Sequence, residues 1–126
     1  MKTETAEWLA KAEGDLRTAQ RELLVTELPN YDAVCFHSQQ CAEKYLKSLL
    51  VEHGRRVPYI HDLEALVVDV CRVYSGVETV ISSARILTAM AVEVRYPGMS
   101  ADMEDAEEAI RAALLIRDVC LKILES

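Results

Sequence analysis

The chain has 126 residues, of which 51% are hydrophobic, and a formal net charge of -7 at pH 7. This length and apolar fraction predict one domain, residues 1–126, with a core of its own. The acidic charge argues against a non-specific nucleic-acid coat, so any nucleotide site must be a local basic patch. The sequence shows neither a signal peptide nor an apolar run of the roughly 18 residues that cross a bilayer, so we expect a cytoplasmic protein without a membrane.

Glycine and proline residues divide the chain into segments of helical length. The first helix is expected from about Thr5 to Leu28, where Pro29 stops it. Its apolar stripe consists of Trp8, Ala12, Leu16, Ala19 and Leu23. The second helix is expected from near Asp32, a candidate N-cap, to near Gly54.

The third helix is expected to begin at His61-Asp62-Leu63, with Asp62 at its N-cap. Ser75 or Gly76 separates it from a fourth helix. The end of the fourth helix, residues 89–94, is apolar most of the way round. We therefore expect it at a subunit interface or deep in the core.

The last helix is expected to start between Ser100 and Asp102, where several carboxylates suit the positive end of the helix dipole. No segment shows the sustained alternation of a strand. The sequence therefore predicts an all-α fold, an antiparallel up-and-down bundle of four long helices plus one shorter helix.

The second helix carries a polar stripe. Residues advance by about 100° each, so one narrow arc collects His37, Gln40, Lys44 and Lys47. An imidazole, an amide and two ammonium groups can donate to phosphate or to base edges, which predicts a ligand-binding face; a solvated helix face is the alternative. Phe36 lies in the same arc, where an aromatic ring favours burial against a partner protomer.

A second candidate site is the junction Arg95-Tyr96-Pro97-Gly98. Arg95 could hold a phosphate through two hydrogen bonds, or it could simply satisfy the last carbonyls of a helix. His61 is a further possible site residue. The four cysteines are expected to be buried free thiols: Cys35, Cys41, Cys71 and Cys120.

Motifs of other chemistry are missing from the sequence. It has no phosphate-binding glycine loop, no nucleophile elbow and no DNA-binding motif. His37 and Cys41 have a spacing that could hold a metal, but further ligands are not evident. The sequence therefore predicts no metal and no cofactor.

Several strings appear together and in a specific order along nearly the whole chain. They are Trp8-Leu9-x-x-Ala12, Phe36-His37-x-Gln39-Gln40-x-Ala42-Glu43-Lys44, Pro58-x-x-His61-Asp62-Leu63, Arg95-Tyr96-Pro97-Gly98 and Asp105-Ala106-x-x-Ala109. In these strings the chain resembles the HEPN domain (higher eukaryotes and prokaryotes nucleotide-binding domain).

The resemblance implies a helical bundle that forms a homodimer, for which we expect Phe36, Met90 and Val92 at the interface. It also implies a prokaryotic protein often paired with a small nucleotidyltransferase in toxin–antitoxin or defence modules. A nucleotide or RNA is the implied ligand, and the expected binding residues are His37, Gln40, Lys44, Lys47, Arg95 and Tyr96.

Many HEPN proteins are metal-independent ribonucleases with an Arg followed, after a short polar stretch, by a His. Here Arg95 is followed by residues 96–103 without a His. RNA cleavage needs a proton acceptor or donor beside the phosphate, so we expect a binding protein rather than an enzyme. The alternatives are a ribonuclease that uses Arg95 with a displaced His37 or His61, and a purely structural interaction partner.

Overall fold

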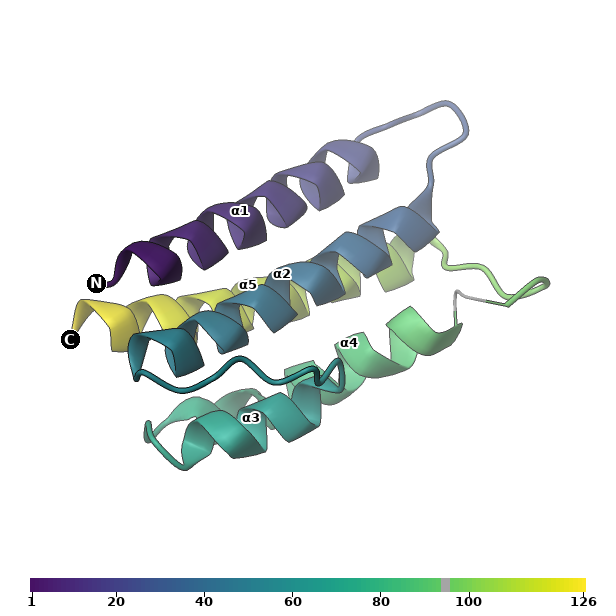
Figure 1. Ribbon diagram of the computed structural model, residues 1–126. Helices are drawn as coiled ribbons and strands as arrows, with labels where there is room; N and C mark the ends of the chain where they lie inside the picture. Colours follow the sequence, from purple (N-terminus) through teal and green to yellow (C-terminus); the bar gives the residue numbers. More distant parts are fainter. Residues whose placement is uncertain (94–95) are drawn as a thin grey trace.

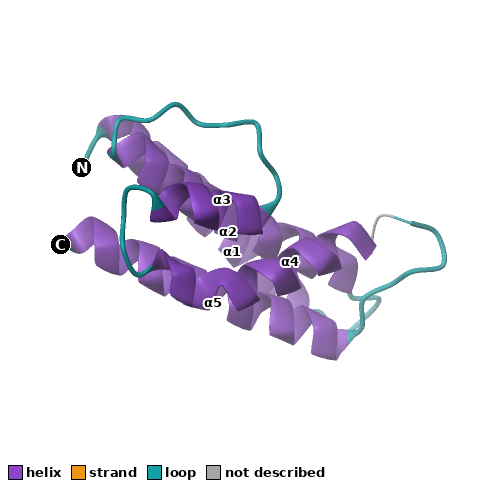
Figure 2. Cartoon of the chain, turned by 90° about the horizontal axis from the view of Figure 1, so that it is seen from below, coloured by secondary structure: helices purple, strands orange, loops and turns teal. Residues whose placement is uncertain are grey.

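The computed structural model describes residues 1–93 and 96–126, and in these residues all regular structure is helical (Figure 2). In chain order the elements are α1 (Thr3–Leu23), α2 (Tyr31–Glu52), α3 (Leu63–Cys71), the 3₁₀ turn η1 (Val77–Val80), α4 (Ile81–Glu93) and α5 (Met103–Glu125). Neighbours α1 and α2 run in opposite directions, and so do α4 and α5 (Figure 1). The predicted all-α fold is confirmed.

The prediction of four long helices needs a correction. Helices α1, α2 and α5 have 21, 22 and 23 residues, whereas α4 as described has 13 and α3 has 9. Gly76, at φ 95°, starts a tight turn before α4. The hydroxyl and the backbone N–H of Thr79 both donate to the Gly76 carbonyl, so this first stretch forms the 3₁₀ turn η1 instead of helix.

Helix α1 ends earlier than predicted, at Leu23 rather than Leu28. Between Leu24 and Leu28 the apolar side chains are exposed, and Leu28 is 97% exposed with a φ of 49°. Asn30, not Asp32, caps α2, because its side chain accepts from the backbone N–H of Ala33 at 3.0 Å. The apolar stripe that stabilises α1 thus stops at Leu23, six residues before Pro29.

Helix α2 is the central element and packs against α1, α3, α4 and α5. Its predicted core side is buried, with Tyr45, Leu46 and Leu49 at 0–1% exposure. Burial also extends to polar positions of the helix, namely Gln39, Glu43, Lys47 and Ser48. A helix covered by four neighbours has no broad solvated face.

Carboxylates cap two of the other helices, α3 and α5. Asp62 caps α3, as predicted, and Asp102 forms a capping box with Asp105 at the start of α5. Asp32, the expected N-cap of α2, instead accepts a hydrogen bond from the backbone N–H of Ala101 at 2.7 Å. This bond ties the segment before α5 to the start of α2.

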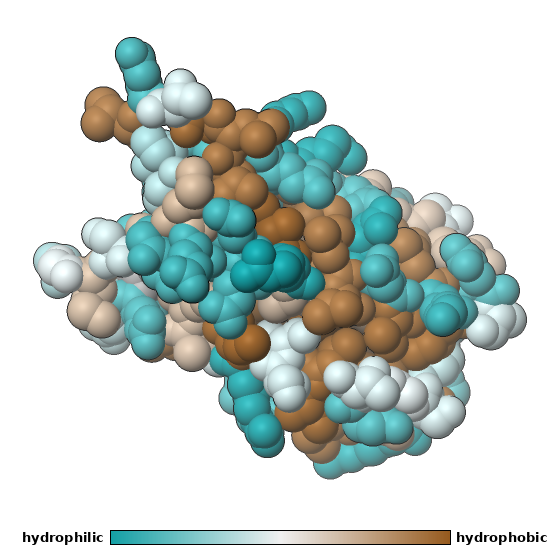
Figure 3. Space-filling model, turned by 180° about the vertical axis from the view of Figure 1, so that it is seen from behind, coloured by the Kyte–Doolittle hydropathy of each residue, from teal (hydrophilic) through white to brown (hydrophobic). Residues whose placement is uncertain are grey.

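No helix in the described ranges 1–93 and 96–126 is long and apolar enough to cross a membrane. Hydrophobic side chains form a band on the face opposite that of Figure 1 (Figure 3). Of the four cysteines, all free, Cys35, Cys41 and Cys120 are buried and Cys71 is half-buried. At the end of α4, Ala91 is buried and Val92 is 46% exposed, so this end does not lie deep in the core as one of the two expectations held.

Candidate functional site

The structure divides the predicted polar stripe of α2 between two carboxylates. The first is Asp15 of α1, whose Oδ1 lies 2.9 Å from Nδ1 of His37 and whose Oδ2 accepts from Nζ of Lys44. The side chains of His37 and Lys44 keep 31% and 23% of their surface exposed. We call this group the Asp15 cluster (Asp15, His37 and Lys44). Its carboxylate offsets the positive charge that the stripe was expected to offer.

The second carboxylate is Glu43. Its Oε2 accepts from Nζ of Lys47 at 3.0 Å and lies 3.1 Å from Nδ1 of His61, while Oε1 accepts from Nε2 of Gln39 at 3.0 Å. We call Glu43, Lys47, His61 and Gln39 the Glu43 cluster. Gln40 lies outside it but contacts it, because Nε2 of Gln40 donates to Oε1 of Gln39 at 2.8 Å.

Burial distinguishes the Glu43 cluster. The side chains of Glu43 and Lys47 are only 5% and 6% exposed, so the alternative of a solvated helix face does not hold at Lys47; its role in ligand binding stays a prediction. Burial by itself would raise the pKa of Glu43. Hydrogen bonds from Gln39, Lys47 and His61 outweigh that effect and hold the pKa below its ordinary value.

Lys47 also lines an open hollow of about 710 Å³. The walls come from α1, from α2 and from the segment between α2 and α3: Trp8, Lys47, Arg56, Val57, Pro58, Tyr59 and His61. Two permanent cations and two large aromatic rings therefore face one space. Trp8, expected in the apolar stripe of α1, is half-buried on this wall.

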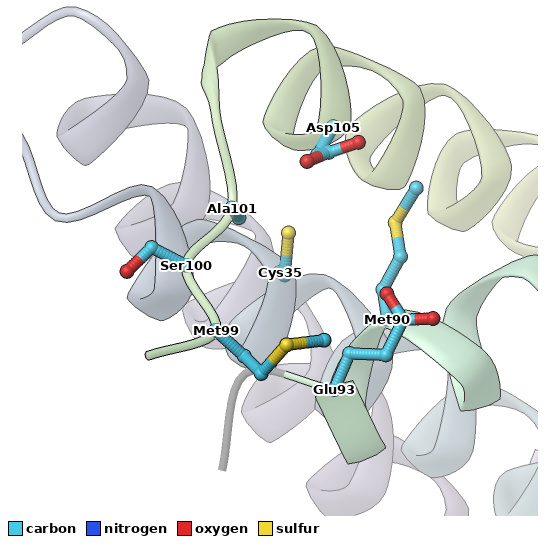
Figure 4. A pocket seen from close by; sticks show the side chains of 7 residues that line it. All are labelled: Cys35, Met90, Glu93, Met99, Ser100, Ala101 and Asp105. Carbon is cyan, nitrogen blue, oxygen red and sulfur yellow. The ribbon is translucent and has the colours of Figure 1, made fainter. Parts of the chain in front are cut away.

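The junction after α4 offers a different environment. Tyr96 is 63% exposed, and Arg95 lies outside the described residues. A hollow of only about 40 Å³ lies beside it, lined by Cys35, Met90, Glu93, Met99, Ser100, Ala101 and Asp105 (Figure 4). Burial, together with the nearby Asp105 and Asp32, raises the pKa of the Cys35 thiol to about 11, so the thiol is neutral. This hollow is too small for a nucleotide, and its carboxylates repel phosphate.

The residues expected at a dimer interface lie near that junction. Phe36 is 47% exposed, Val92 is 46% exposed and Met90 is half-buried. Their contact with a second protomer stays a prediction. Within residues 1–93 and 96–126, no group of three His, Cys, Asp or Glu side chains could hold a metal ion.

A family model described as HEPN domain matches residues 5–124. The chain belongs to the HEPN family. This HEPN chain is 29% identical to the protein in the crystal structure of TT1696 from Thermus thermophilus, with a TM-score of 0.80 over 96% of this chain and 98% of that one. It is 26% identical to ST0689, an archaeal HEPN homologue, with a TM-score of 0.73 over 97% and 98% of the two chains. No curated protein matches it significantly.

Several side chains at these sites in the HEPN domain are not predicted from the sequence. Asp15 lies at the edge of the α1 stripe, and periodicity does not show which residue of α2 it meets. Arg56 and Tyr59 lie between Gly54 and His61, where no helical period applies. One signal could have indicated them: a cation, Arg56, and an aromatic residue, Tyr59, flank Pro58 in a loop, and loops often carry binding residues.

Proposed function

We propose that this HEPN protein is a non-catalytic nucleotide- or RNA-binding homodimer that acts as partner of a small nucleotidyltransferase in a toxin–antitoxin or defence-type module. The supporting observation is a local gathering of positive side chains on a chain of net charge -7. Lys44, Lys47 and Arg56 lie on the C-terminal half of α2 or on the segment that follows it; Asp15 and Glu43 pair with the two lysines, so the net positive charge comes from Arg56. A local basic patch on an acidic protein favours a bound anion over general attraction to nucleic acid.

Isothermal titration calorimetry of the full chain with AMP and with a short single-stranded RNA tests the binding role. We expect saturable binding that weakens as salt is added, because phosphate contacts release counterions. Absence of saturable heat with both ligands would contradict the proposed function.

The homodimer is tested separately by light scattering. We expect a dimeric mass for the wild type and a monomeric mass for Phe36→Asp. Leu115→Asp is the matched control, since Leu115 is 56% exposed on α5 and is not among the residues expected at the interface. A monomeric wild type, or two variants that behave alike, would count against Phe36 as an interface residue.

The nucleotidyltransferase partnership needs a two-protein experiment. Small nucleotidyltransferases of the same source organism would each be mixed with this chain and run on a size-exclusion column. Co-elution is expected, and separate peaks at micromolar concentration would remove this part of the proposal.

A second candidate function is RNA cleavage by Arg95 with a displaced His. One observation favours it: Glu43 holds Nδ1 of His61, which leaves Nε2 of a ring 69% exposed to exchange a proton. RNA incubated without metal should then be cleaved by the wild type and left intact by Arg95→Ala and His61→Ala. Intact RNA with the wild type would leave the binding role.

A further inference from the structure

The hollow beside Lys47 has the size and position of a ligand site. Its volume of about 710 Å³ falls in the range of roughly 300–1,000 Å³ that small-molecule pockets occupy. It is the largest of the hollows described above, and its wall joins three separate parts of the fold. Two other hollows, of about 270 and 190 Å³, are lined by no arginine and by no Trp, Tyr or Phe.

The polar side of the hollow suits a phosphate. Lys47 is almost completely buried by its neighbours, its side chain being 6% exposed, and one of the three N–H groups of its ammonium binds Glu43. Among residues 1–93 and 96–126, Glu43 is the one hydrogen-bond partner of this ammonium, which lines the hollow and could also donate to a ligand. Glu43 balances the charge of Lys47, so the net positive charge comes from Arg56, whose planar guanidinium can grip a phosphate with two hydrogen bonds.

The apolar side of the hollow suits a base. Tyr59 is 99% exposed, and Trp8 on α1 lines the same space. Among the described residues, ring contacts join Phe36 to His37 and His53 to Tyr74, so Trp8 and Tyr59 enter none of them. Aromatic rings on a cationic wall are the combination with which proteins stack bases.

We propose that this hollow binds a nucleoside 5′-monophosphate group, with the base against Trp8 and Tyr59 and the phosphate on Lys47 and Arg56. The group is either a free mononucleotide or the 5′ end of an RNA. The inference rests on the proposed nucleotide-binding function and assigns it to this hollow, rather than to the Asp15 cluster or the junction at Tyr96.

The chain supplies its own probe, because Trp8 is its single tryptophan. Trp8 fluorescence would be followed during titration with AMP, adenosine and inorganic phosphate. We expect AMP to change the signal saturably and to bind at least about tenfold more tightly than adenosine or phosphate, since only AMP fills both sides. Equal affinity for AMP and adenosine would overturn the phosphate assignment.

Two exposed residues can be changed without disturbing the core. Arg56→Glu should weaken AMP binding by more than tenfold, and Tyr59→Ala by about tenfold, the effect of losing one stacked base. Arg111→Glu makes the same charge change at an exposed position of α5 and should leave the affinity for AMP unchanged. Unchanged affinity in Arg56→Glu would overturn the proposal.

Calorimetry run in parallel separates the two levels. Heat that saturates without a Trp8 signal, and that survives Arg56→Glu, would place the nucleotide elsewhere and leave the proposed function standing. No heat at all would overturn both. Finally, a Trp8 response to 5′-phosphorylated RNA but not to AMP identifies an RNA end as the ligand, whereas equal binding of 5′-hydroxyl RNA would contradict a monophosphate site.

Discussion

Helix α2 carries two clusters of the same composition, a carboxylate between a histidine and a lysine, in two different settings. In the Asp15 cluster the two partners of the carboxylate remain 31% and 23% exposed. In the Glu43 cluster the lysine and the carboxylate are almost completely buried, and a third donor, Gln39, completes the group. The same residue types therefore form a partly exposed group at one place and, at the other, a buried carboxylate–lysine pair whose histidine, His61, is 69% exposed.

The difference has an energetic consequence. When the partner of an exposed charge is removed, water hydrates that charge, so a surface pair contributes little to the free energy of unfolding. A buried charge has no such replacement, and removing its partner is costly even where the intact pair adds little. The Glu43 cluster, which also borders the large hollow, is therefore expected to tolerate substitution less well than the Asp15 cluster.

The largest effect is expected for Glu43→Ala. The substitution leaves Lys47 buried without its counter-ion, and we expect the free energy of unfolding to fall by about 3 kcal/mol. Urea unfolding followed by circular dichroism measures it. The double variant Glu43→Ala with Lys47→Met should recover part of the loss, because no buried charge is left. A loss in the single variant below about 1 kcal/mol would contradict the dependence on Glu43.

An effect of intermediate size is expected in the pH dependence of the free energy of unfolding, when wild type and Glu43→Ala are compared. The folded pKa of Glu43 lies below its ordinary value of 4.5, so the unfolded chain binds the proton more readily. The stabilisation is fully present above pH 4.5 and is lost as the pH falls through the lower folded pKa. The stability gap between wild type and Glu43→Ala, measured by urea unfolding, should therefore narrow below pH 4.5. A gap that stays constant would exclude a contribution from Glu43 ionisation.

The smallest effect is expected for Asp15→Asn. The amide keeps the shape of the side chain but loses the charge, and both His37 and Lys44 can turn toward water. We expect a loss of about 1 kcal/mol or less in the same unfolding experiment. A loss equal to that of Glu43→Ala would show that exposure does not separate the two clusters.

Much of the fold could be predicted from the sequence because its signals are local. Apolar residues at helical spacing predicted helices in the right order, and Asp62 and Asp102 marked the starts of α3 and α5. The errors fell where a long-range contact decides. Asp32 was expected to cap its own helix but binds Ala101, 69 residues away in sequence. The 3₁₀ turn before α4 is an exception with a local cause, because it depends on the bonds that Thr79 makes to Gly76, three residues earlier.

The sequence by itself determined that the chain is helical, that it belongs with HEPN proteins, and that the chemistry of α2 is unusual. Only the tertiary structure decided where that chemistry points. A helical period places Lys44 and Lys47 on neighbouring positions, but it cannot say that α1 brings Asp15 to one while Glu43 and the α2–α3 segment enclose the other. The hollow joins Trp8 of α1 to Tyr59, 51 positions later in the chain, and to Lys47 of α2. Packing creates such a site, because no local pattern records which distant segments meet.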